Sequence, residues 1–244
     1  MRFLYRSGIY RDNYRLLTDF NSIIQNIAIM AIPVVLAITF HEAAHGWVAN
    51  KLGDPTAKHA GRLTLNPIAH IDPFGTILLP IITYIFAGFI IGAAKPVPVN
   101  FANLRNPKRD MIWVGAAGPG VNIAMALICG ILFQLLVTQS MYMTSRSGFL
   151  SYILLPLILM LKEGIKWNVV LAVFNLIPVP PLDGSRILAG LLPYKQAEFL
   201  GRLEPYGLLI ITFLVFLNPF GFMTYIIWPI MSVLTRLFAG MPVF

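Results

Sequence analysis

The sequence predicts an all-α polytopic membrane protein with about five to six transmembrane helices. Hydrophobic residues make up 57% of the 244 residues, charged residues only 11%, and the mean hydropathy is +0.75. Soluble globular domains carry roughly twice that share of charge, so the composition excludes them. No polar stretch is long enough to fold separately. We therefore expect a basic arm at 1–20 and one membrane domain at 21–244, with its core at 30–190 and C-terminal helices at 206–240.

The charge distribution indicates a lipid bilayer as the surrounding partner. Lys and Arg number 18 against 10 Asp and Glu, for a net charge of +8. A nucleic-acid binder gathers its basic residues on a polar face. Here they occupy short gaps between apolar runs, as in loops that face anionic headgroups, so we expect no nucleic-acid partner. Cys129 is the only cysteine, which excludes disulfides and thiolate zinc sites.

The first apolar run predicts the first spanning helix. The arm before it carries Arg2, Arg6, Arg11 and Arg15 and predicts a surface segment or an interfacial helix. No charged residue then occurs between Asn21 and Glu42. This run is too long for the core of a signal peptide. We expect a helix of about 25 residues that ends near Ala49.

Five more apolar runs follow, at 73–94, 111–138, 149–181, 206–217 and 222–240. Lys162, Glu163 and Lys166 interrupt the run at 149–181, which is either one long helix with a polar patch or two helices. The run at 206–217 is short and is followed by Asn218 and Pro219, so it predicts a tilted or incomplete span.

Two polar stretches predict extended backbone. Apolar residues alternate in 62–67 (RLTLNP), and two prolines occur in 95–100 (KPVPVN). Both patterns favour strand or polyproline geometry over helix.

The motif with clear chemistry is HEAAH at 41–45. Residues four apart share a helix face, so His41 and His45 can bind one zinc ion, and Glu42 can reach water at that ion. This arrangement is typical of peptide-bond hydrolysis. With 4 His in the chain, HExxH has a likelihood of roughly one in a thousand by accident. The plain alternative is that these residues lie in the headgroup layer and reach water.

A catalytic zinc site needs a third protein ligand. The candidates are Asp183, Asp54, Asp72, Glu163, His59 and His70. We favour Asp183, because it follows a strongly apolar stretch and three helix-breaking prolines. Irregular backbone at membrane depth is tolerated where it is buried in protein or lines a water-filled cavity. The alternative for Asp183 is a solvated turn at a helix end.

The pairing of HEAAH at 41–45 with FNLIPVPPLDG at 174–184 resembles the site-2 protease family of intramembrane zinc metalloproteases. GRLTLNP, AKPVPVN and AGPGVN resemble its compact prokaryotic branch, and no appended peptide-binding or nucleotide-sensing domain is expected. The resemblance implies that His41, His45 and Asp183 bind one Zn²⁺ per chain and that Glu42 is the general base.

The resemblance also bears on residues that are not assigned as zinc ligands or as the base. Asn175 would donate to the scissile carbonyl, with an interhelical hydrogen bond as the alternative role. Gly118 and Asn122 match a glycine-proline-asparagine helix of the family, where small residues allow close helix approach, and we expect no catalytic role for them.

The implied function is cleavage of a peptide bond within or near a transmembrane segment. The substrate would be a single-pass membrane protein or a remnant peptide, and the enzyme a multi-pass protein of a prokaryotic cell membrane. The oligomeric state is left open. A transporter or channel, or a catalytically silent scaffold that binds helices, is the alternative function.

Metal geometry decides between two topologies. If all six apolar runs cross, His45 and Asp183 lie at opposite faces, although zinc ligands must lie about 2 Å from the ion. If 73–94 instead forms a re-entrant hairpin and the amino terminus is outside, both residues share one depth toward the cytoplasmic side. The distribution of Lys and Arg barely separates the two topologies. Because zinc ligands must lie close together, we expect the re-entrant one.

Overall fold

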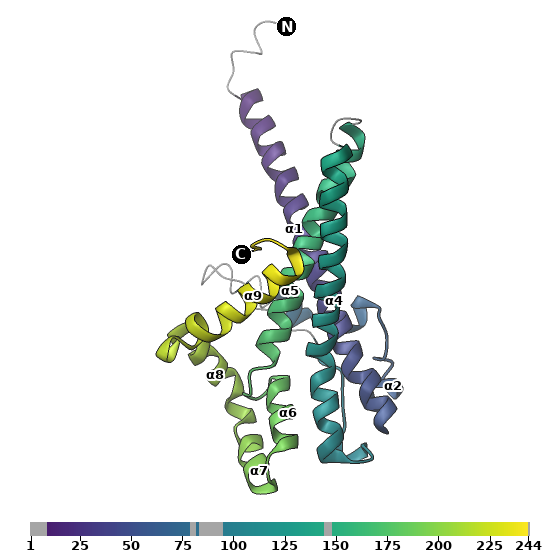
Figure 1. The fold of residues 1–244 in the computed structure, drawn as a ribbon, viewed down its shortest axis with the longest axis vertical. Helices are drawn as coiled ribbons and strands as arrows, with labels where there is room; N and C mark the ends of the chain where they lie inside the picture. The colour runs from purple at the N-terminus through teal and green to yellow at the C-terminus, as the bar shows by residue number, and fades with distance from the viewer. Residues whose placement is uncertain (1–8, 79–81, 83–94, 144–147, 244) are drawn as a thin grey trace, which may run out of the picture.

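The computed structural model describes residues 9–78, 82, 95–143 and 148–243, and every regular element among these residues is helical (Figure 1). Four helical segments in these ranges are long and apolar enough to cross a membrane: Ile27–Leu52, Pro107–Gln139, Tyr194–Leu217 and Pro219–Ala239. The all-α class is confirmed, and the four segments indicate a membrane protein.

The first helix, α1 (Ile9–Leu52), is longer than expected. It begins at Ile9 rather than at Asn21, so most of the predicted arm continues the spanning helix. Pro33 lies inside α1 without ending it. Its last turn carries Lys51, where a positive charge is favourable beside the helix dipole.

A long connection leads from α1 to the next long helix. It contains α2 (Thr56–His59), 3₁₀ turns at Pro67–His70 and Phe101–Asn103, and a π-helical turn at Pro73–Leu78. Residues 62–66 and 95–100 are neither helix nor strand, so the predicted absence of helix holds there and no strand forms. The re-entrant hairpin expected over 73–94 falls largely outside the described residues.

The two irregular stretches are joined to each other. Arg62 Nη2 donates to the carbonyl of Lys95 at 2.8 Å, and the Lys95 N–H donates to the carbonyl of His70 at 3.0 Å. These hydrogen bonds join segments that lie 33 and 25 residues apart in the sequence.

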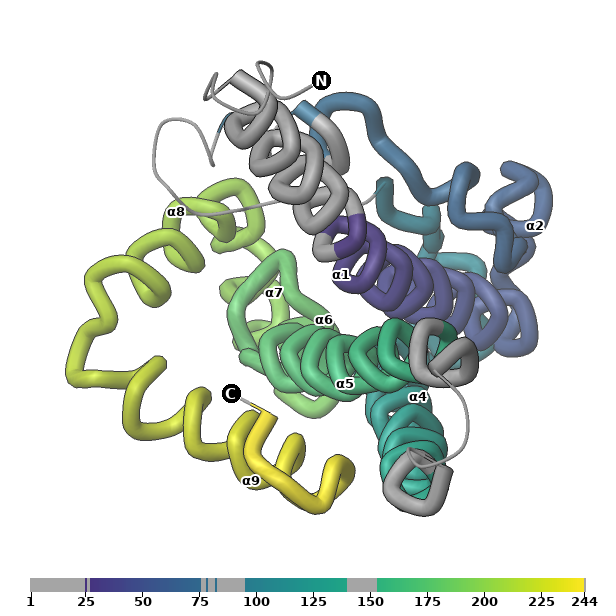
Figure 2. Tube along the Cα trace, turned by 90° about the horizontal axis from the view of Figure 1, so that it is seen from above, coloured from purple at the N-terminus to yellow at the C-terminus, as the bar shows by residue number. Residues whose placement is uncertain are grey.

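Two long helices, α4 (Pro107–Met143) and α5 (Gly148–Asn175), pack with α1 as the centre of the molecule (Figure 2). The α5 helix runs unbroken through its polar patch, which answers the question that the sequence left open. Glu163 pairs with Lys166 at 3.0 Å within it. After Asn175 the chain becomes irregular over 176–182, where the run of prolines prevents further helix.

Four more α-helices follow, α6 (Asp183–Leu191), α7 (Tyr194–Arg202), α8 (Gly207–Thr212) and α9 (Trp228–Ala239), and 3₁₀ and π-helical turns connect the last three. Asn218 adopts a left-handed conformation (φ 42°) and ends the run after α8, as predicted. The carbonyl of Phe238 near the end of α9 accepts a 2.8 Å hydrogen bond from Gln134 of α4. Apolar packing of α4, α5 and α9 around Val169 and Met231 forms one part of the core.

Candidate metal centre

His41 and His45 lie one turn apart on the inner face of α1. They are 6% and 9% exposed, and their Nε2 atoms are 3.1 Å apart. The rings meet edge to face, with centroids 4.7 Å apart. The helical spacing of four residues therefore brings both imidazoles to one point, as the motif predicts.

Asp183 reaches the same point from α6. Its Oδ2 lies 3.1 Å from His41 Nε2 and 3.3 Å from His45 Nε2, and the aspartate side chain is 17% exposed. This contact excludes any topology that separates His45 from Asp183 across the membrane. The expectation that these two residues share one depth is met.

The irregular stretch before α6 forms a tight turn that places Asp183 next to the two histidines. A Cβ at Gly184 would overlap the carbonyl of Leu176 and lie 2.6 Å from that of Ile177. Only glycine permits this approach, so the chain can end α5 and present the first residue of α6 toward α1.

The outer nitrogens of both imidazoles contact oxygen acceptors. His41 Nδ1 lies 2.5 Å from Asn122 Oδ1, and His45 Nδ1 lies 2.7 Å from the carbonyl of Val114. We assign the ring proton to Nδ1 in each case, because an acceptor faces it. Each Nε2 then presents a lone pair to the shared point.

The orientation of the Asn122 amide is itself determined by neighbours. Its Nδ2 donates to Asn168 Oδ1 at 2.8 Å and to the carbonyl of Ala37 at 3.2 Å. Asn168 in turn donates to the carbonyl of Gly164 at 2.8 Å. This buried chain of hydrogen bonds directs Asn122 Oδ1 at His41, although the sequence suggested only a packing role for this residue.

The three converging atoms fit a metal ion. His41, His45 and Asp183 each offer one ligand atom. Asp183 Oδ2 is buried without a hydrogen-bond donor. Zinc binds such atoms tetrahedrally at about 2.0–2.2 Å, which places two ligands about 3.3 Å apart. The observed separations of 3.1–3.3 Å match that spacing, and a cation would relieve the repulsion among three lone pairs.

Gly118 of α4 forms a wall of this centre. A Cβ at this position would overlap His45 Nε2 and lie 2.6 Å from His41 Nε2. A glycine here therefore leaves the space in which the imidazole nitrogens meet. The requirement is local, because a Cβ at Gly120 two residues later would contact no atom within 4 Å.

Glu42 is half-buried beside the two histidines on α1. Its Oε2 accepts a 2.8 Å hydrogen bond from the backbone N–H of Val97. The carboxylate is thus tied to the irregular 95–100 segment.

Asn175 is not part of the three-residue cluster. Its Nδ2 donates to the carbonyl of Leu171 at 3.0 Å, one turn back in α5. This contact is neither the donor role nor the interhelical bond considered from the sequence.

Asp54 binds the connecting loop instead of a metal. Its buried carboxylate accepts hydrogen bonds from Asn100 N–H at 2.7 Å, from Asn103 Nδ2 at 3.0 Å, and from the N–H and hydroxyl of Thr56. Burial raises the pKa of this carboxyl, but these hydrogen bonds outweigh it and hold the pKa of Asp54 below its usual range.

The other candidate ligands also lie outside the cluster that the described residues form. They are exposed or have other partners: His59 is exposed on α2, His70 Nε2 contacts the carbonyl of Thr64, Asp72 accepts from the N–H of Gly75, and Glu163 pairs with Lys166.

Sequence reasoning named Asn122 without its contact to His41, and it missed Asn168 and the carbonyl of Val114. The two asparagines carried a signal, because polar side chains inside apolar helices are rare and mark functional positions. The Val114 carbonyl carried none, since every residue has one.

Comparison with known proteins gives related chains. The chain is 39% identical over 208 residues to "Putative zinc metalloprotease YwhC" of Bacillus subtilis, covering 83% of this chain and 85% of that protein. It is 26% and 28% identical to proteins named "Putative zinc metalloprotease Rip2" from Mycolicibacterium smegmatis and Mycobacterium tuberculosis H37Rv. The matches span 64% and 65% of those proteins' lengths. No family model and no solved structure matches the sequence.

Proposed function

Because the chain belongs to the zinc metalloprotease family that includes YwhC of Bacillus subtilis, we propose that it is an intramembrane endopeptidase of the site-2 protease type. Its substrate would be a peptide bond within or near a transmembrane segment of another membrane protein. The observation that carries the proposal is the convergence of His41, His45 and Asp183, with Glu42 beside them.

We assign His41, His45 and Asp183 as the ligands of one zinc ion per chain. Asn122 and the Val114 carbonyl would act through the imidazoles, holding each ring so that Nε2 faces the metal. When bound, zinc would polarise a peptide carbonyl and lower the pKa of a bound water molecule to about 7.

Glu42 is assigned as the general base and acid. Its Oε2 is held by the Val97 N–H, which fixes the carboxylate plane and leaves Oε1 to receive a proton from the attacking water. Glu42 would then pass that proton to the amine of the departing peptide. For Asn175 to donate to the scissile carbonyl, its amide would have to leave the carbonyl of Leu171.

A substrate helix must unwind before any of its carbonyls can react, because helical carbonyls are hydrogen-bonded. We propose that the stretches 62–67 and 95–100 bind the unwound strand by edge pairing. Pro96 and Pro98 have no N–H, and the N–H groups of Val97 and Asn100 are donated to Glu42 and Asp54. The 95–100 segment would therefore bind the substrate chiefly through its carbonyls.

Two variants of the purified full chain test the assignment. Glu42→Gln should keep one zinc per chain and lose cleavage of a transmembrane test substrate by at least about a hundredfold. Asp183→Asn should contain less zinc when measured by atomic absorption. Cleavage by Glu42→Gln at the wild-type rate, or unchanged zinc in Asp183→Asn, would refute the respective role.

The same preparations separate the alternative functions. A transporter or channel would produce flux in liposomes that does not depend on Glu42. A silent scaffold would bind the substrate helix but leave it uncut, with or without a chelator. Chelator-sensitive cleavage distinguishes the protease from both.

A further inference from the structure

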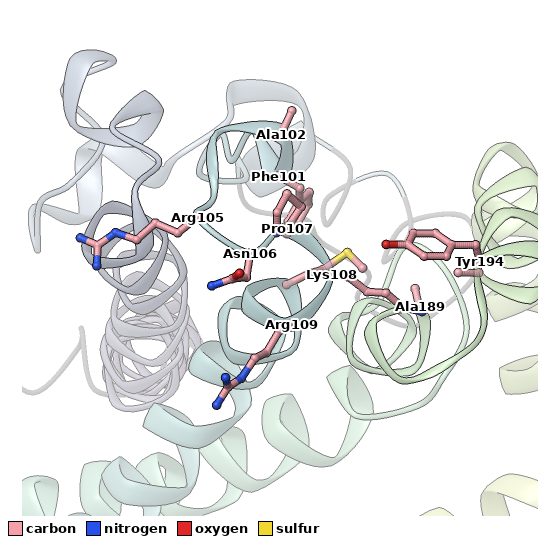
Figure 3. A pocket seen from close by; sticks show the side chains of 11 residues that line it. Phe101, Ala102, Arg105, Asn106, Pro107, Lys108, Arg109, Ala189 and Tyr194 are labelled. Carbon is pink, nitrogen blue, oxygen red and sulfur yellow. The ribbon is translucent and has the colours of Figure 1, made fainter.

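A cavity lies outside the metal cluster, where α4 begins and α6 meets α7 (Figure 3). Its volume is about 580 Å³. Phe101, Met111 and Ala189 contribute apolar wall, and Arg105, Lys108 and Arg109 contribute positive charge. None of the cavity residues belongs to the metal cluster, so an inference from it does not rest on the proposed proteolysis.

The basic side chains of this cavity have no ion-pair partner among the described residues. Arg105, Lys108 and Arg109 form no ion pair with any residue that the structure describes, whereas Arg186 nearby pairs with Glu204 at 2.5 Å. Asp110 is buried, and its Oδ2 is bonded to the N–H of Asn106. The positive end of the α4 dipole adds to the potential.

Lys108 is the cation that faces the cavity interior. It is half-buried, and its Nζ lies 4.4 Å from the centroid of the Tyr194 ring. Figure 3 shows Lys108 extending toward Tyr194, with the guanidinium groups of Arg105 and Arg109 on the opposite side. The aromatic face covers one side of the ammonium and leaves other N–H groups for a ligand.

The ends of two candidate spans lead us to expect this cavity at the depth of lipid headgroups. Pro107 and Tyr194, both in its lining, are the first residues of two candidate membrane spans. Trp113, one to two turns into the first of these spans, is 59% exposed, and Tyr194 is 80% exposed. Exposed Trp and Tyr are enriched at membrane interfaces, and basic pockets at that depth bind anionic headgroups.

We propose that this cavity binds a phosphate ester, supplied by the headgroup of an anionic phospholipid. Lys108 donates to the phosphate oxygens, while the guanidinium groups of Arg105 and Arg109, which extend away from Tyr194, attract the anion at longer range. The apolar wall contacts the glycerol backbone and the first carbons of the acyl chains.

Native mass spectrometry of the purified full chain in neutral detergent tests the proposal. The probe is an equimolar mixture of phosphatidylglycerol and phosphatidylcholine with identical acyl chains. The wild type should retain phosphatidylglycerol in excess. Lys108→Gln should lower that retention about fivefold, as expected for one interfacial cation. Lys58→Gln is the matched control, because Lys58 is exposed on α2 and outside the cavity, and it should retain lipid as the wild type does.

Bound zinc should be unchanged in Lys108→Gln, which shows that the variant is folded. The double variant Arg105→Gln/Arg109→Gln alters only exposed side chains and provides a second test. We expect it to lose less phosphatidylglycerol than Lys108→Gln does. Equal retention of the two lipids by the wild type, or equal losses in Lys108→Gln and Lys58→Gln, would overturn the proposal. Displacement of phosphatidylglycerol by equimolar glycerol 3-phosphate would support a phosphate-ester site but overturn the lipid as its source.

Discussion

The carboxylate of Glu42 in α1 and the backbone N–H of Val97 are joined by a 2.8 Å hydrogen bond, although 55 residues separate them. Val97 is buried, and its Cγ1 packs so closely on α1 that a Cβ at Gly46 would lie 3.0 Å from it. The irregular 95–100 segment is therefore fixed beside the metal centre. A main-chain donor, which no side-chain substitution removes except proline, orients the proposed base.

Replacing that donor tests its role. Val97→Pro removes the N–H in a segment that already contains Pro96 and Pro98. We expect cleavage to slow by about tenfold or more, because the base loses its orientation, with unchanged zinc content. Val97→Ala keeps the N–H and should cleave close to the wild-type rate. Equal activity of the two variants, measured on one transmembrane substrate, would show that the hydrogen bond does not position Glu42.

The Asn122 amide should control metal affinity. Asn122→Ala removes the acceptor of His41 Nδ1, and we expect zinc affinity to fall about 10–100-fold in a competition titration with a chromophoric chelator. Asn168→Ala also disrupts the buried polar chain but leaves Asn122 Oδ1 in place, so its loss should be smaller. Similar zinc affinities in the two variants would mean that Asn122 acts only through packing.

A single added methyl group should block the centre. Gly118→Ala places a Cβ onto the imidazole nitrogens, so we expect little bound zinc and no measurable cleavage. Gly120 lies on the same helix, and a Cβ there would meet no atom within 4 Å. The Gly120→Ala variant should therefore bind one zinc ion per chain. Stoichiometric zinc in Gly118→Ala would contradict the geometry of the site.

Asp54 should stabilise the fold in a pH-dependent way. Because its folded-state pKa is depressed, the contribution is complete above the unfolded pKa of about 3.9 and is lost as the pH falls through the folded value. Asp54→Asn should therefore melt at a lower temperature than the wild type at pH 7, and the difference should shrink below about pH 4. Zinc content at neutral pH should stay at the wild-type level, since Asp54 is not a ligand. A melting difference that is constant across this range would contradict the assignment.

The helix repeat made the histidine pair of the metal centre predictable from the sequence. His41 and His45 share a face because an α-helix repeats every 3.6 residues, so the spacing alone brought both imidazoles together. The apolar runs were equally readable, because burial in lipid demands them along the whole span. The start of α1 at Ile9 could not be predicted from the sequence, because the arginines of the arm indicated an exposed segment but did not exclude a helix.

The sequence by itself determined the membrane class, the face of the histidine pair and the candidacy of Asp183. Only the tertiary structure decided that Asp183 rather than Asp54 meets the histidines, that Asn122 and the Val114 carbonyl hold their outer nitrogens, and that Val97 holds Glu42. The physical reason is that helical periodicity relates residues a few positions apart, whereas contacts between distant segments depend on how whole helices pack. Main-chain donors and acceptors are identical at nearly every position, so their partners appear only once the chain is folded.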